Sequence, residues 1–117
     1  MDFNSDKPIY LQLYERICES ALSGQTPPES RIPSVREYGA EVGVNPNTVM
    51  RTYEKLTREG IIYNKRGIGY FVSPDAPKII LEHARQEFLT TELPELARRM
   101  KLLGITPEEV MQIISRN

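Results

Sequence analysis

Three polar residues, Asn47, Thr48 and Arg51, stand close together in the segment VNPNTVMRTYEKL, which runs from residue 44 to residue 56. The amide of an asparagine and the guanidinium of an arginine can each form paired hydrogen bonds with the edge of a base, and a threonine hydroxyl can form a single one. On a helix, Asn47 and Arg51 lie one turn apart on the same side. The chemistry that this spacing favours is hydrogen bonding in the major groove of DNA.

The same segment carries the signals of a helix that begins at residue 46. Asn45 can accept a hydrogen bond from an amide of the first turn, and Pro46 suits the first helical position. Gly60 is expected to end the helix as a left-handed cap. One side is apolar and the roughly opposite side carries donors. The apolar residues are Val49, Tyr53 and Leu56, and the donors are Asn47, Arg51, Lys55 and Arg58.

A shorter helix is expected just upstream. Ser34 and Glu37 have the spacing of a capping box, in which each side chain bonds to the backbone amide of the other residue. Gly43 then supplies the tight turn toward Asn45, and two short helices joined in this way form a helix-turn-helix. The first helix of such a motif crosses the DNA backbone while the second enters the groove. Arg36 is therefore placed to meet a phosphate or a base.

Further elements complete a winged helix-turn-helix. The apolar positions between Pro8 and Gly24 recur with a helical period and predict a supporting helix, whereas residues 25–33, with three prolines, predict a loop. Residues 61–64 and 70–73 have strand composition and flank a turn that contains Lys65, Arg66 and Gly67. We therefore expect a basic β-hairpin, the wing, beside the second helix of the motif.

Three blocks, in this order, resemble the DNA-binding domain of the GntR family of bacterial transcription regulators: KPIYLQLYERI (7–17), IPSVREYGAEVGVNPNTVMRTYEKL (32–56) and RGIGYFV (66–72). The VNPNTV core followed by a short tail is similar to the YtrA-type subfamily. The resemblance implies an operator-binding dimer, usually a repressor. With their neighbours in the motif and the wing, the candidate DNA-binding residues are Ser34, Arg36, Asn45, Asn47, Thr48, Arg51, Lys55, Lys65, Arg66 and Gly67.

The sequence departs from the family pattern at several positions. Glu29 and Ser30 stand where the family commonly has a glycine and then an acidic residue, so the turn there is expected to differ. Pro46 and Met50 stand where other branches often carry arginine. The base preferences of those branches therefore do not carry over to this chain.

Charge and composition limit the class of protein. The formal net charge of the 117 residues is −1, but residues 31–72 hold seven basic residues against four acidic ones, a local surplus that suits phosphate neutralisation. Cys18 is the only cysteine, which fits a reducing cytoplasm, and no run approaches the roughly 20 apolar residues that span a membrane. His83 and Glu87 are two potential ligands, too few for a metal site. The sequence therefore predicts a cytoplasmic protein with no cofactor and no enzymatic activity.

Residues 76–117 predict a short all-α tail after the winged domain, which we place at residues 1–75. Pro94 is expected to kink the helix there or restart it, and Thr106 with Pro107 predicts a last helix. So small an apolar segment cannot form a core alone, so it must pack on the winged domain or on a second copy, and we favour the second copy. The candidate dimer-interface residues are Ile80, Ala84, Phe88, Leu96, Met100 and Leu103.

The fold class is thus mainly α with a small β-hairpin, and the leading function is a homodimeric regulator, a repressor by the resemblance, that binds a palindromic double-stranded operator. The alternative is a winged helix that serves as a protein-interaction module without reading DNA. A chain of 117 residues has no room for a large sensor domain beside the winged helix. The sequence does not show whether a small-molecule effector binds elsewhere.

Overall fold

The computed structural model describes residues 6–117 and divides the chain into two compact units. The first unit ends at Leu81 and the second comprises Glu82–Asn117. This division falls later than the sequence boundary between residues 75 and 76. The reason is that helix α4 (Ala76–Glu87) begins inside the first unit, where Ala76 and Ile80 are buried in the apolar core.

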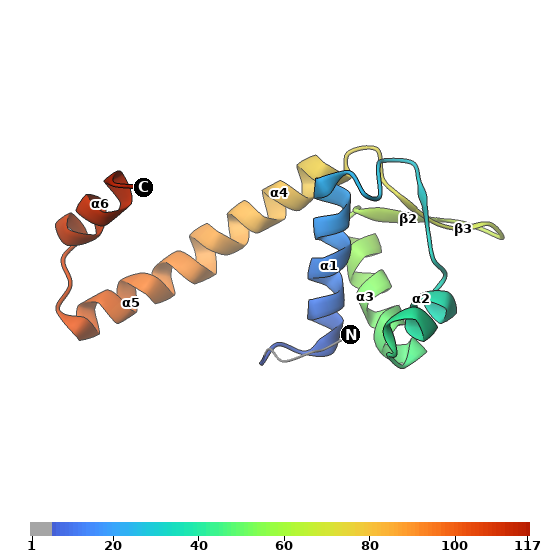
Figure 1. The fold of residues 1–117 in the computed structure, drawn as a ribbon, viewed down its shortest axis with the longest axis horizontal. Helices are drawn as coiled ribbons and strands as arrows, with labels where there is room; N and C mark the ends of the chain where they lie inside the picture. Colours follow the sequence, from blue (N-terminus) through green and yellow to red (C-terminus); the bar gives the residue numbers. More distant parts are fainter. Residues whose placement is uncertain (1–5) are drawn as a thin grey trace. The chain divides into compact units, whose positions relative to one another are not determined.

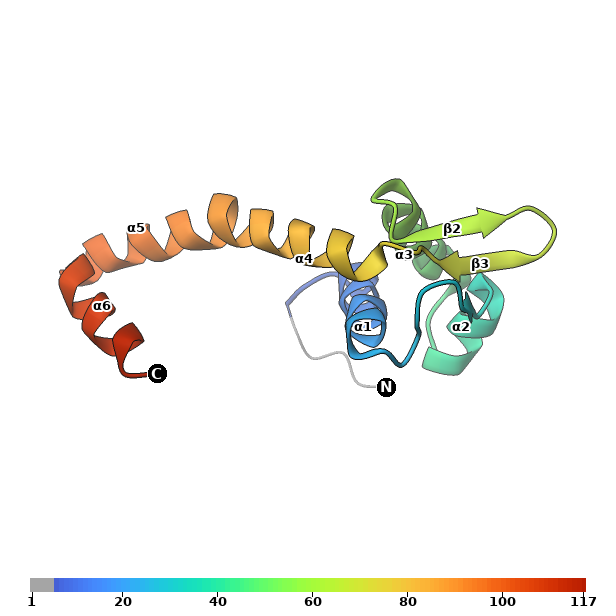
Figure 2. The same ribbon diagram turned by 90° about the horizontal axis from the view of Figure 1, so that it is seen from above.

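Three helices build the first unit: α1 (Ile9–Ser23), α2 (Val35–Val42) and α3 (Pro46–Arg58). Both α1 and α2 pack against α3, which lies between them (Figures 1 and 2). Leu13 of α1 and Val49 and Leu56 of α3 are fully buried at the centre of the core. Helix α3, which carries the candidate reading residues, is thus fixed by the packing of its apolar face against α1 and α2.

The predicted helix caps of the helix-turn-helix are confirmed. The Ser34 hydroxyl accepts a hydrogen bond from the Glu37 amide at 3.1 Å, and the Glu37 carboxylate accepts one from the Ser34 amide at 3.0 Å. The side chain of Asn45 accepts a hydrogen bond from the Asn47 amide at 2.8 Å, and Pro46 occupies the first turn of α3. These bonds satisfy amides that lack a partner at a helix start, and so they fix where α2 and α3 begin.

The turn between α2 and α3 depends on a close approach of backbone to backbone. A Cβ atom added to Gly39, within α2, would lie 2.7 Å from the carbonyl oxygen of Val44. Gly43 adopts a left-handed φ of 71° and donates its amide hydrogen to the Gly39 carbonyl. A glycine in the middle of α2 therefore permits the second helix to start directly beside the first.

The wing belongs to a three-stranded antiparallel sheet of β1 (Arg31–Ile32), β2 (Ile62–Lys65) and β3 (Gly69–Val72), in the order β1-β3-β2. The expectation that residues 25–33 form only a loop is wrong, because β1 pairs with β3 there. The Glu29 amide donates a hydrogen bond to the Val72 carbonyl oxygen at 2.8 Å, and the Val72 amide donates one to the Ser30 carbonyl oxygen at 2.9 Å. Each hairpin strand is shifted by one residue from its expected position.

The second unit continues α4 through a π-helical stretch, η1 (Phe88–Glu92), into α5 (Leu93–Leu103), and ends with α6 (Pro107–Ser115). The expected interruption at Pro94 is this π-helical turn, in which the Leu93 amide donates to the Phe88 carbonyl five residues earlier. The proline itself lies in the first turn of α5. The wider turn accommodates the residue that has no amide hydrogen. The predicted start of the last helix is confirmed by a capping box between Thr106 and Glu109.

The helices of the second unit leave many large apolar side chains uncovered. Phe88 is 49% exposed, Leu96 is 46% exposed and Leu103 is 67% exposed. No side chain of η1, α5 or α6 is buried. Among residues 6–117, no helix combines the length and the apolar character needed to cross a membrane.

Candidate nucleic-acid interface

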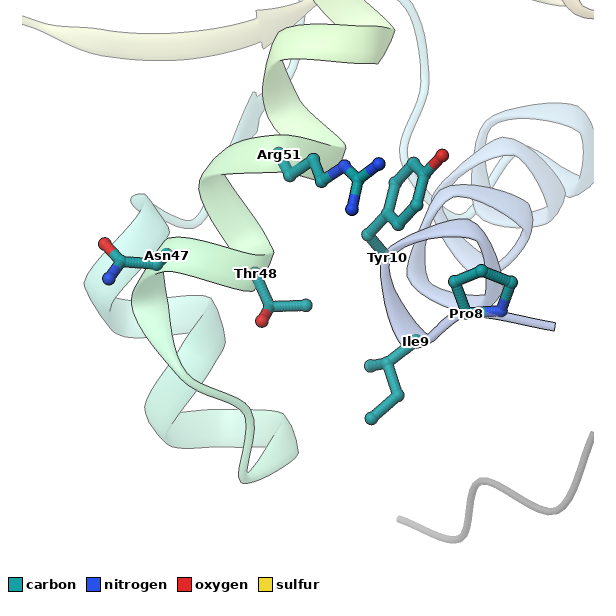
Figure 3. A pocket seen from close by; sticks show the side chains of 6 residues that line it. All are labelled: Pro8, Ile9, Tyr10, Asn47, Thr48 and Arg51. Carbon is teal, nitrogen blue, oxygen red and sulfur yellow. The ribbon is translucent and has the colours of Figure 1, made fainter. Parts of the chain in front are cut away.

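The start of α3 presents the predicted reading residues together. Asn47 and Arg51 are exposed and Thr48 is half-buried. They line a shallow groove of about 340 Å³ between the first turns of α1 and α3, which Pro8, Ile9 and Tyr10 complete from the other side. In Figure 3, Asn47 points away from α1 while the side chain of Arg51 extends toward it. The three side chains therefore offer hydrogen-bonding groups around the exposed start of α3.

Arg51 is held by an aromatic ring. Its Cζ atom lies 3.9 Å from the ring centroid of Tyr10 on α1, and Figure 3 shows the two groups against each other. Within residues 6–117, no carboxylate forms an ion pair with this guanidinium. An aromatic ring has no net charge and so does not offset the charge of a cation that lies over it, whereas a paired carboxylate does offset it. Arg51 is thus oriented and still cationic.

Lys55, one turn later on α3, has a different environment. Its ammonium lies 2.6 Å from the Glu59 carboxylate and 4.7 Å from the ring centroid of Tyr14. The Tyr14 hydroxyl donates a hydrogen bond to the other oxygen of the same carboxylate. The Lys55 and Glu59 side chains are only 26% and 14% exposed. The charge of Lys55 is therefore largely compensated inside the protein, and we leave this residue out of the proposed DNA contacts.

Tyr14 and the nearby Cys18 are kept protonated by their surroundings. Burial, followed by the hydrogen bond to Glu59, raises the pKa of Tyr14 above its ordinary value. Burial likewise raises the pKa of the nearby Cys18 thiol to about 12. A thiol with so high a pKa is not a nucleophile at neutral pH. This part of the α1 and α3 junction therefore has a packing role.

Two of the predicted contacts, Ser34 and Asn45, have their side-chain oxygens engaged in the helix caps described above. Arg36, which follows Ser34 on the first turn of α2, is exposed. The capping hydrogen bonds from Ser34 hold the pKa of Glu37 below its usual range. This carboxylate consequently stays ionised and bound to its cap near neutral pH.

The wing carries a second set of basic side chains. Lys65, Arg66 and Gly67 are all exposed at the turn between β2 and β3, and Gly67 has a left-handed φ of 79°. Figure 2 shows this hairpin reaching out from the helices, with its turn at the far end. The Lys65 ammonium lies 4.7 Å from the ring centroid of Phe71, so its stem follows the strand. Arg66 is the wing cation at the tip itself.

The base of the wing is braced by contacts that the sequence did not predict. Phe71 stacks on Tyr63, with 5.8 Å between ring centroids, and the Tyr63 hydroxyl donates to the Glu29 carboxylate at 2.8 Å. Glu29 itself has a left-handed φ of 71°, at a position where the family commonly has glycine. The Arg31 side chain covers Gly69, where an added Cβ would lie 2.9 Å from its Nε atom. These contacts fix the direction of the hairpin.

The sequence pattern places Tyr10 among the apolar positions of the supporting helix between Pro8 and Gly24, and it does not indicate that Tyr10 is part of this site. A signal existed in the sequence, because Tyr10 and Tyr14 have the same four-residue spacing as Arg51 and Lys55. The packing of α1 against α3 then shows that these tyrosines lie opposite these two cations. Among residues 6–117, no group of three or more potential metal ligands is found.

Comparison with known proteins places this geometry in a family. Residues 9–72 match the description "Bacterial regulatory proteins, gntR family". The chain is 36% identical to the HTH-type transcriptional regulator YhcF of Bacillus subtilis, over 94% of this chain and 89% of that protein. It is 33% identical to the HTH-type transcriptional repressor YtrA of the same organism, over 97% and 87% of the two chains.

Solved structures agree with the sequence relatives. A protein described as a transcriptional regulator of the GntR family from Bacteroides thetaiotaomicron superimposes with a TM-score of 0.80 and 44% identity, over 93% of this chain and 95% of that one. The DNA-binding domain of AraR, solved in complex with operator ORX1, superimposes with a TM-score of 0.57 and 27% identity, over 62% of this chain and 93% of that one.

Proposed function

Because the chain belongs to the gntR family of bacterial regulatory proteins and to its YtrA-type branch, and so is a DNA-binding regulator rather than an enzyme, we propose that it is a homodimeric repressor of a palindromic operator. In this proposal α3 enters the major groove, α2 crosses the backbone and the wing lies along the adjacent phosphates or minor groove. Since bacterial DNA lies in the cytoplasm, the proposed repressor acts there.

The observation that supports the proposal most strongly is the set of polar residues exposed at the start of α3. Asn47, Thr48 and Arg51 come together on a helix whose opposite face is fully buried, so their backbone positions are fixed before any ligand binds. A bidentate arginine contact with guanine is among the commonest specific contacts in the major groove, and asparagine forms the corresponding bidentate contact with adenine. We propose that these three residues read base edges, while Arg36 and Arg66 contact phosphates.

The second unit supports the proposal of a dimer. Its uncovered side chains, among them Phe88, Leu96 and Leu103, are the kind that a soluble domain buries against a partner. A palindromic operator is read by two copies related by a two-fold axis, with recognition helices about one DNA turn apart. We therefore propose that a second copy of the chain covers Ala84, Phe88, Leu96 and Leu103, together with the half-buried Met100. We leave Ile80 out, because the first unit already buries it.

A salt titration tests the DNA-binding part of this proposal. Binding of the full chain to duplexes of random sequence, about 30 base pairs long, should weaken linearly on a plot of log affinity against log salt, as counterions are released. The variant Arg66→Ala should lower the slope by about one, since each lost phosphate contact removes close to one unit.

A matched control is Lys101→Ala, which removes one exposed cation from α5 and should leave the slope unchanged. Absence of binding to any duplex at low salt would contradict the proposal. That outcome would favour the alternative, a winged helix that docks on a protein partner.

A further inference from the structure

Two aromatic rings of α1 face two cations of α3 in matching register. Tyr10 and Tyr14 lie one turn apart on α1, and Arg51 and Lys55 lie one turn apart on α3. The distances from cation to ring centroid are 3.9 Å for Arg51 over Tyr10 and 4.7 Å for Lys55 over Tyr14. The two helices therefore meet through a ladder of two cation–π contacts.

The two contacts of this ladder differ in what surrounds the cation. Lys55 also pairs with Glu59, whose carboxylate accepts a hydrogen bond from the Tyr14 hydroxyl, so this cation is compensated within the protein. Arg51 has the Tyr10 ring and, among the described residues, no carboxylate partner. Only the contact nearer the groove leaves a full positive charge available to an outside ligand.

The Tyr10 ring is itself held in place. Thr52, which follows Arg51 on α3 and is fully buried, donates its hydroxyl hydrogen to the Tyr10 carbonyl oxygen at 2.7 Å. This bond fixes the backbone of Tyr10 against the turn of α3 that carries Arg51. The Tyr10 side chain is half-buried and lines the groove together with Asn47 and Thr48. Ring and guanidinium are thus placed by the packing of the two helices.

We propose that Tyr10 is a positioning residue for sequence readout, which holds the Arg51 guanidinium at the groove beside Asn47 and Thr48 without neutralising it. This inference rests on the proposed function, since it needs α3 to read DNA. A free arginine side chain samples many rotamers and loses that freedom when it binds. A guanidinium that already lies on a ring loses less, so the gain appears in base discrimination as well as in affinity.

The experiment compares the affinities of the full-length protein for two duplexes, one selected by the wild type from a random pool and one with the same composition in scrambled order. The quantity measured is the ratio of these two affinities. Tyr10→Leu removes the ring but keeps an apolar side chain, and it should lower the ratio by about three- to tenfold, the range of a partly exposed cation–π contact. Tyr10→Phe keeps the ring and should keep the ratio.

Two further variants separate positioning from packing. In an Arg51→Ala background, Tyr10→Leu should cause no further fall in the ratio, because the side chain that Tyr10 positions is gone. Tyr14→Leu is the matched control one turn along: it removes the ring beneath Lys55 and should leave the ratio unchanged. Thermal unfolding of each variant confirms that it is folded at the temperature of the binding measurement.

The outcomes distinguish this inference from the proposed function. A wild type with equal affinity for both duplexes would overturn both. If the wild type discriminates and Arg51→Ala does not, an unchanged ratio in Tyr10→Leu would overturn the inference alone. A fall of the ratio in Tyr10→Phe as large as that in Tyr10→Leu would also overturn it, since it would show that the hydroxyl, and not the ring, is responsible for the effect.

Discussion

The hydroxyl of Tyr53 donates a hydrogen bond to the carbonyl oxygen of Pro33 over 2.6 Å. Tyr53 is fully buried on the inner face of α3, and Pro33 immediately precedes the cap of α2. Burial raises the pKa of Tyr53 above its ordinary value, so the hydroxyl is protonated and can donate near neutral pH. This bond ties the entry of the first helix of the motif to the core side of the second.

Replacing Tyr53 with Phe should lower the free energy of unfolding by about 1 kcal/mol, the net value of a typical buried hydrogen bond. The ring remains, so its edge-on contact with Tyr70, 5.0 Å between centroids, is kept. Urea unfolding checks this expectation through a lower midpoint with an unchanged slope. An unchanged midpoint would show that the bond to Pro33 contributes nothing net.

Replacing Gly39 with Ala should destabilise the protein by about 1–3 kcal/mol, because the new methyl group would press on the Val44 carbonyl. Helix propensity alone argues for the opposite sign, since alanine is favoured over glycine by about 1 kcal/mol within a helix. The sign of the change in thermal unfolding is therefore decisive. A more stable Gly39→Ala variant would contradict the close approach between α2 and the following turn.

Arg51→Ala and Arg66→Ala should weaken DNA binding in different ways. Loss of a base contact at Arg51 should cost about 1–3 kcal/mol on the preferred duplex and relax the preference at one position. Loss of a phosphate contact at Arg66 should weaken all duplexes evenly and reduce the salt slope by about one. Competition titrations with single-base variants of the duplex separate the two patterns. Identical patterns would contradict the assignment of reading to α3 and of backbone contact to the wing.

Glu37→Gln should remove a pH-dependent part of the stability. The folded-state pKa of Glu37 is depressed by its hydrogen bonds to Ser34, so its contribution is present above the unfolded-state pKa and is lost as pH falls through the folded-state pKa. The wild type should therefore be the more stable of the two near neutral pH. The difference in melting temperature should shrink as the solution is made acidic. A difference that stays constant down to the acid limit would contradict the role of this carboxylate.

Leu96→Glu should convert the dimer to monomers in light scattering, because it places a charge within the apolar surface that we propose a second copy covers. Lys101→Glu is the control, since it adds the same carboxylate at an exposed polar position of the same helix. A dimer that persists in Leu96→Glu, or one that dissociates equally in Lys101→Glu, would count against this interface.

Local signals in the sequence predicted the helix-turn-helix well. The capping box of Ser34 and Glu37 and the cap at Asn45 involve residues two or three positions apart, so their geometry is set by the chain itself. The same holds for Gly60, which follows α3 with a left-handed φ of 81°, and for the capping box at Thr106. The start and end of an element can be predicted when the bonds that define it are short in sequence.

What the sequence did not predict depends on partners distant in the chain. Strand β1 is only two residues long and exists through its pairing with β3. The position of Lys55 on its own helix predicts a DNA contact. The structure shows that Lys55 pairs with Glu59 and that this carboxylate also accepts a hydrogen bond from the Tyr14 hydroxyl, 45 residues away from Glu59 in the sequence. Ile80 fitted the apolar stripe of the tail, but the core of the first unit buries it. Each of these required knowledge of which elements meet.

Selection of bound sequences from a pool of random duplexes by the full-length wild type tests the central claim most directly. A dimer that reads DNA through α3 should enrich two inverted half-sites whose centres are about one helical turn apart, roughly 34 Å, or a multiple of it. Arg51→Ala should enrich the same repeat with one base position relaxed. A pool without enrichment, or one dominated by a single half-site without symmetry, would contradict a homodimeric regulator that reads a palindromic operator.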